Sequence, residues 1–369
     1  MINKDFDSLA KRSIYYFTST YTPFYPVESD RATAEEQAKA HAFLKGIYDA
    51  LYENPALLGF KELPDDSFDR WQTQKEKPAL PGKIRGVINK THEFIALIHS
   101  IALNGERESD VFVLANDAIA IKRQHIKQLS GFAVKTSAAD THMQFEFPEG
   151  MAKGLKLLAE LSVANMNAPL RNRANPSLLF SRGVFDITAP FNEAVFGAML
   201  DNSDAYNKLI DFLTANNYTR INNKEINNNI SLDFVKYYGA PDDEVKSGWA
   251  ERTHGGVEFI YEELRKNQLL ITLRIPFFGE LLENWEKMNE KVLEFVTQTS
   301  KKCDNCRYCV STDKSGKRPL AFKRVGSYAV CPYFCGFQYS WKHLDDELSG
   351  KMIEMLIYID KTFANKTKK

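Results

Sequence analysis

The chain has 369 residues, of which 44% are hydrophobic and 26% are charged, so it is long enough and apolar enough to form a packed core and two domains. Its 48 basic and 48 acidic side chains cancel, and a neutral chain creates no overall field that attracts nucleic acid or an anionic membrane. No stretch approaches the roughly 18 uninterrupted apolar residues of a membrane-spanning helix. The acids Asp5 and Asp7 do not suit a secretory signal, so we expect an unprocessed cytoplasmic protein.

The N-terminal part of the chain predicts two amphipathic helices. Asp30 can cap the first helix, whose apolar residues recur at helical spacing as far as Leu51, and Asn54-Pro55 marks its end. After a connection rich in proline, the apolar residues from Ile88 to Ile101 predict the second helix, which Gly105 ends.

A hairpin, a proline and a helix then follow one another twice along the chain. The first copy lies within roughly 85–165 and has its proline at Pro148, and the second lies within roughly 200–300 and has its proline at Pro276. After Pro276 the apolar spacing predicts one helix that runs through Leu281 and Phe295. Proline suits both places because it cannot continue a strand ladder but fits the entry of a helix. The order predicts an α+β protein with two hairpin-plus-helix modules. Duplication is one hypothesis for their origin, and chance recurrence of a common unit is the other.

These elements give a domain plan. The Asn-rich and Pro-rich stretch between the modules is the linker, and the apolar stripe of the last helix packs on the core. That stripe consists of Met352, Met355, Leu356, Ile359 and Phe363. The plan divides the chain into an N-terminal α+β module at 1–165, a linker at 166–190, a second α+β module at 191–300, a cysteine-rich segment at 301–341 and a closing helix at 342–369.

All five cysteines fall in one short window, Cys303, Cys306, Cys309, Cys331 and Cys335. Two close-set groups of thiols separated by a stretch long enough for a hairpin are typical of four ligands around one metal ion. In an intracellular protein, clustered cysteines are more often metal ligands than disulfides. We expect a structural zinc site formed by Cys306, Cys309, Cys331 and Cys335, with Cys303 as an alternative ligand.

The spacing of these thiols resembles the plan of zinc-ribbon modules over some 35 residues, although ribbons usually carry a second two-residue knuckle. Three cysteines at two-residue spacing followed by a distant Cys331-Pro332 also resemble the ligand set of a ferredoxin-type 4Fe-4S cluster. In that pattern the fourth cysteine comes much closer and small apolar residues surround the cluster, so zinc is the favoured metal. Free or redox-active thiols are the remaining alternative.

The cysteine window is basic. Within 301–324 there are eight lysines and arginines against Asp304 and Asp313. These cations can neutralise the thiolates around a metal, which is the interpretation we favour for a neutral chain. They can also bind nucleic acid, with Tyr308, Phe322, Tyr328 and Tyr333 stacking on bases.

The most reactive-looking stretch combines Arg252, His254 and Glu258 beside two glycines, just before a predicted strand. A titratable imidazole, a cation and a carboxylate are the parts of an acid–base site. The alternative is a turn that uses Gly255-Gly256 to begin the hairpin and leaves His254 exposed, and it is the interpretation we favour.

Two classes of function remain. In the first, the protein is a ligand-binding or regulatory α+β protein whose ligand lies in a cleft lined by Trp249, Phe259, Tyr261 and Trp285. In the second, it is a metal-dependent or His/Glu acid–base enzyme, or an iron–sulfur redox protein. A catalytic zinc keeps one position open for water, whereas here there are enough thiols to close the shell, which favours binding over catalysis.

Overall fold

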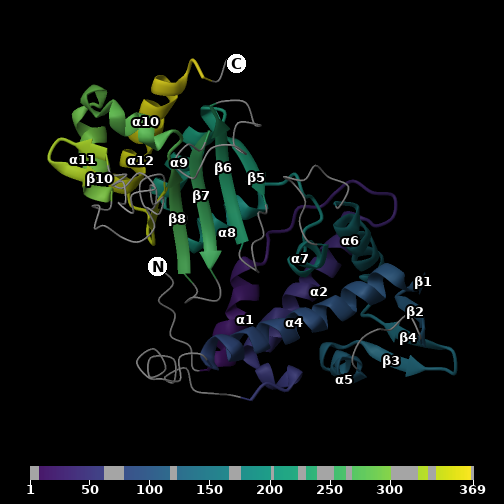
Figure 1. Ribbon diagram of the computed structural model, residues 1–369. Coiled ribbons are helices and arrows are strands. Elements are labelled where there is room, and N and C mark those ends of the chain that lie inside the picture. Colours follow the sequence, from purple (N-terminus) through teal and green to yellow (C-terminus); the bar gives the residue numbers. More distant parts are fainter. Residues whose placement is uncertain are drawn as a thin grey trace, which may run out of the picture. The chain divides into compact units, whose positions relative to one another are not determined.

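The computed structural model describes residues 8–61, 79–116, 123–165, 176–200, 203–222, 230–238, 253–262, 268–300, 323–330 and 338–366. Helices and sheets occur in separate runs, which confirms the α+β class. The chain forms two compact units (Figure 1), of which the first is built mainly from Met1–Met199 and the second mainly from the chain beyond Leu200.

The first unit is a helical assembly with one small sheet. α1, α4 and α6 pack against one another or against α2, and Phe17 of α1 stacks on Tyr48 of α2. The helices are α1 (Leu9–Thr20), α2 (Ala34–Glu53), η1 (Pro55–Leu58), α4 (Ala79–Asn104), α5 (Arg123–Gln128), η3 (Leu129–Phe132), α6 (Ala152–Ala164), α7 (Pro176–Ser181) and α8 (Phe191–Met199). α7 lies within 166–190, which the sequence plan assigned to a linker.

Helix α2 begins at a capping box rather than at Asp30. The Thr33 hydroxyl accepts from the Glu36 amide at 3.2 Å, and the Glu36 carboxylate accepts from the Thr33 amide at 2.9 Å. Two amides that lack an intrahelical partner are thereby satisfied. The helix ends at Asn54 and Pro55, as predicted.

Helices α2 and α6 approach each other closely because Gly154 has no side chain. A Cβ atom on Gly154 would lie 2.2 Å from the carbonyl oxygen of Glu36 and 2.8 Å from the Cβ of Ala40. The contact therefore depends on a glycine on α6.

We expect Gly154→Ala to lower the free energy of unfolding of the first unit by about 1–3 kcal/mol, because the added methyl group forces the two helices apart. Gly46→Ala is the matched control, since a Cβ there meets nothing within 4 Å and alanine favours the helix by about 0.5–1 kcal/mol. Thermal and urea unfolding of both variants measure the difference, and equal stability of the two would contradict the close approach.

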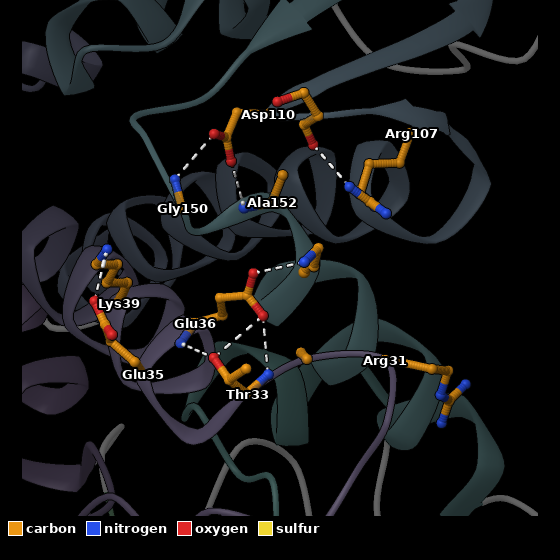
Figure 2. Close-up of polar contacts among 12 residues, drawn as sticks. Arg31, Thr33, Glu35, Glu36, Lys39, Arg107, Asp110, Gly150 and Ala152 are labelled. Carbon is orange, nitrogen blue, oxygen red and sulfur yellow. Dashed lines mark hydrogen bonds and ion pairs between the residues drawn. The ribbon is translucent and has the colours of Figure 1, made fainter.

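The sheet of the first unit is antiparallel and is tied to α6. Its strands β1 (Glu106–Glu108), β2 (Val111–Ala115), β3 (Lys135–Ala138) and β4 (His142–Glu146) lie in the order β1-β2-β4-β3. Buried Phe112 pairs with buried Phe145 across the two central strands. Figure 2 shows Asp110, in the turn before β2, accepting from the amides of Gly150 and Ala152 at 3.0 and 3.3 Å, which caps the start of α6.

The second unit contains a mainly antiparallel sheet of five strands in the order β11-β8-β7-β6-β5. The strands are β5 (Thr219–Asn222), β6 (Ile230–Tyr237), β7 (His254–Glu262), β8 (Gln268–Arg274) and β11 (Gln338–Trp341). Because side chains alternate along a strand, one face carries the buried apolar residues Leu232, Phe234, Val257, Phe259, Tyr261, Ile271, Leu273 and Tyr339. This face forms the core of the unit.

Helices cover that apolar face. Tyr206 of α9 packs edge-on against Phe259, Phe278 of α10 packs against Tyr339, and Phe363 of α12 packs against Tyr238. The helices are α9 (Asp204–Ala215), α10 (Phe278–Glu283), η8 (Trp285–Lys287), α11 (Glu290–Thr299) and α12 (Asp346–Phe363). All five residues of the predicted stripe on the last helix are buried.

A pair of neighbouring strands precedes a helix in each unit. β3 and β4 precede α6, and β7 and β8 precede α10. The expected single helix through Leu281 and Phe295 is wrong, because the chain forms α10, η8 and α11 with an extended residue at Met288. The two sheets differ in strand number and order, and duplication stays a hypothesis.

Within the part of the chain that the structure describes, no helix is both long enough and apolar enough to cross a membrane.

Candidate functional site

Three charged side chains lie on the face of the second unit's sheet opposite its apolar core. Asp233 is on β6, Glu258 on β7 and Arg274 on β8, and these three strands are neighbours in the sheet (Figure 1). We call these three residues the charged row. Their exposed fractions are 1%, 4% and 8%, although charged side chains are almost never fully buried unless they are paired.

The strand register places the two carboxylates opposite each other. The Tyr238 amide donates to the Thr253 carbonyl at 2.8 Å, and Gly256 lies directly beside the Phe234 carbonyl. In an antiparallel pair the partner of a residue moves forward by one when the residue moves back by one. Since Tyr238 pairs with Thr253, Asp233 faces Glu258 five positions along. Side chains in such a pair lie about 5 Å apart, and like charges there are destabilising.

The guanidinium group of Arg274 contacts both carboxylates. One terminal nitrogen, Nη1, donates to Oδ2 of Asp233 at 3.2 Å, and the other, Nη2, pairs with Oε2 of Glu258. If both carboxylates were ionised, the charged row would carry one net negative charge. That charge would sit in a place with little solvent to stabilise it.

A proton on Glu258 would remove this uncompensated negative charge. The pKa of Glu258 is raised to about 7 because burial and the charge of Asp233 raise it more than the Arg274 guanidinium lowers it. A carboxyl group that titrates near neutral pH is the kind of group that functional sites contain.

Two polar atoms of the charged row have no hydrogen-bond partner among the described residues. These are Oδ1 of Asp233, an acceptor, and Nε of Arg274, a donor. A buried polar group without a partner is costly, so an unpaired acceptor and an unpaired donor in one cluster are a specific signal for a bound polar group.

The acid–base candidates predicted from the sequence do not form one cluster. His254 and Glu258 lie four positions apart on β7, which in a strand is roughly 13 Å. His254 is half-buried with its ring against Tyr237 at 5.8 Å, whereas Glu258 joins the charged row. Arg252 lies outside the described residues.

Two of the four aromatic residues proposed for a ligand cleft lie on the apolar face of the sheet. Phe259 and Tyr261 are buried on the apolar face, where Phe259 contacts Tyr206. Trp285 is half-buried in η8, and Trp249 lies outside the described residues.

The five cysteines also lie outside the described residues, but the structure describes both ends of their segment. Ser300, at the end of α11, and Tyr339, on β11, form a hydrogen bond between their hydroxyl groups. The segment thus leaves and re-enters the second unit at neighbouring points. Among the described residues, no group of His, Cys, Asp or Glu side chains is arranged to hold a metal ion.

A hairpin lies within this segment. β9 (Lys323–Val325) pairs with β10 (Tyr328–Val330), and Gly326 takes a left-handed conformation in the turn. Val325 and Val330 are buried while Tyr328 is 52% exposed, and β9 contacts α10. The stretch between the two groups of thiols was predicted to be long enough for a hairpin, and this hairpin ends at Val330, directly before Cys331.

No protein-family model matches the chain, and neither curated proteins nor solved structures gave a match.

Proposed function

We propose that this protein is a ligand-binding or regulatory α+β protein whose second unit is held together by a structural zinc ion and binds its ligand at the charged row. The observation that carries the zinc part is the hydrogen bond between Ser300 and Tyr339. It joins the two ends of a segment that contains every cysteine of the chain.

A segment whose two ends are joined in this way suits a metal ion that cross-links it, and we call this ion the metal staple. The segment begins three residues before Cys303 and ends four residues after Cys335, so each group of thiols starts or ends close in sequence to one of the two joined ends. The β9–β10 hairpin separates the two groups and leads directly into Cys331. Four thiolates complete a tetrahedral shell, which supports a structural rather than a catalytic ion.

The charged row supports the binding part of the proposal. Oδ1 of Asp233 accepts and Nε of Arg274 donates, and both atoms lack a partner among the described residues. A small polar group with a donor beside an acceptor, such as a primary amide, would satisfy both atoms. We therefore place the ligand at the charged row rather than at the aromatic residues of the apolar face.

Single Cys→Ser variants test the zinc site. We expect Cys306→Ser, Cys309→Ser, Cys331→Ser and Cys335→Ser each to lose most of the bound zinc, since each removes one thiolate of a four-ligand shell. Cys303→Ser is the matched control and should keep one equivalent. Zinc per protein is measured with a chromogenic chelator after the protein is unfolded. Full zinc in all five variants would contradict the site.

Acid–base catalysis by Glu258 is the second candidate. Its pKa of about 7 allows the group to give and take a proton at neutral pH. In this case Arg274 orients Glu258, and Glu258→Gln abolishes turnover while ligand binding persists. If Glu258→Gln still binds the ligand, and the wild-type protein shows no turnover whose pH dependence follows Glu258, the binding protein is favoured instead.

A further inference from the structure

We propose that one proton, held between Glu258 and Asp233, keeps the charged row closed, and that losing this proton as the pH rises towards neutral opens the face to its ligand. This inference rests on the proposed binding role of the charged row and concerns how that role is regulated.

The geometry favours such a proton. Glu258 and Asp233 face each other across adjacent strands, and Arg274 is the cation that contacts both of them. One guanidinium neutralises one carboxylate. The second carboxylate is either protonated, and then donates to the first, or is a buried charge without compensation.

The charged groups around Glu258 agree with this arrangement. Among the described residues, Asp233 and Arg274 are the charged groups in contact with it, and His254 lies further along the same strand. Burial and the charge of Asp233 raise the pKa of Glu258 to about 7, whereas a solvent-exposed glutamate titrates near 4.5. Between about pH 4.5 and 7, Glu258 is thus protonated when the face is closed and deprotonated when the face is open.

The direction of the pH dependence follows. Between about pH 4.5 and 7 the closed face holds a proton that the open face has released, so raising the pH favours opening by up to tenfold per pH unit. Above pH 7 both forms are deprotonated and the dependence ends. Because the three side chains are less than a tenth exposed, a ligand reaches them only in the open form.

Hydrogen–deuterium exchange of the full-length protein at pH 5.5, 6.5, 7.5 and 8.5 tests the inference. After correction for intrinsic exchange, we expect the protection of β6, β7 and β8 to fall by about tenfold per pH unit up to pH 7 in the wild type. Glu258→Gln keeps the shape of the protonated side chain, and its protection should stay constant. An equal pH dependence in both proteins would overturn the inference.

Asp233→Asn gives a second readout that a merely structural role would not move. Removing the charge of Asp233 removes one of the two main causes of the raised pKa, so the pH at which protection levels off should shift downwards. An unchanged position would overturn the shared proton. Zinc content measured on the same samples separates the two proposals: full zinc with pH-independent protection overturns only the proton, and absent zinc overturns only the metal staple.

Discussion

Arg274→Met is expected to lower the free energy of unfolding of the second unit by about 3–5 kcal/mol, the usual cost of removing one partner from a buried ion pair. The variant leaves Asp233 and Glu258 opposite each other with no cation between them. Urea unfolding followed by tryptophan fluorescence, to which Trp341 stacked on Phe295 of α11 contributes, measures the loss.

Two further variants define what this loss means. Arg85→Met, on an exposed position of α4, should change stability little. The triple variant Asp233→Leu, Glu258→Met and Arg274→Met should recover most of the loss, because well-packed apolar residues can replace a buried ionic cluster at little or no cost. A wild-type unfolding curve for Arg274→Met would contradict the contacts of the charged row.

Gly256→Ala should destabilise the same sheet by about 3–5 kcal/mol, since backbone strain and overpacking each contribute roughly 1–3 kcal/mol. Gly256 has a φ of +145°, a backbone conformation that residues other than glycine rarely adopt. A Cβ atom there would lie 1.8 Å from the carbonyl oxygen of Phe234. The clashing atom belongs to the backbone of the neighbouring strand, so a rotamer change cannot relieve the clash.

Gly350→Ala is the matched control for Gly256→Ala within the same unit. Gly350 lies in α12, and a Cβ there meets nothing within 4 Å, so alanine should be neutral or slightly stabilising. If the unfolding midpoints of the two variants coincide, the close pairing of β6 and β7 is wrong.

The helices were predicted best where apolar spacing and capping residues agreed. The stripe of α12 and the end of α4 at Gly105 were read correctly from the sequence, because periodic burial and a strong stop act locally. The apolar spacing does not predict α1, and it predicts one continuous helix from Leu281 to Phe295. Met288 there takes an extended conformation, which continuous apolar spacing does not reveal.

The charged row could be predicted only in part. Glu258 was singled out for its proximity in sequence to His254, whereas its partners come from other strands. Asp233 and Arg274 interrupt the apolar runs Ile230–Val235 and Leu269–Ile275, and a charge within a strand-forming run is the signal that could have found them. Their meeting depends on strand order and register, which no local pattern encodes.

The metal staple remains the central proposal, and elemental analysis with an absorption spectrum of untagged protein, purified anaerobically, tests it most directly. We predict one equivalent of zinc per chain and a colourless sample. Iron with sulfide and a brown colour, or protein that is free of metal, would contradict the closed four-cysteine zinc site.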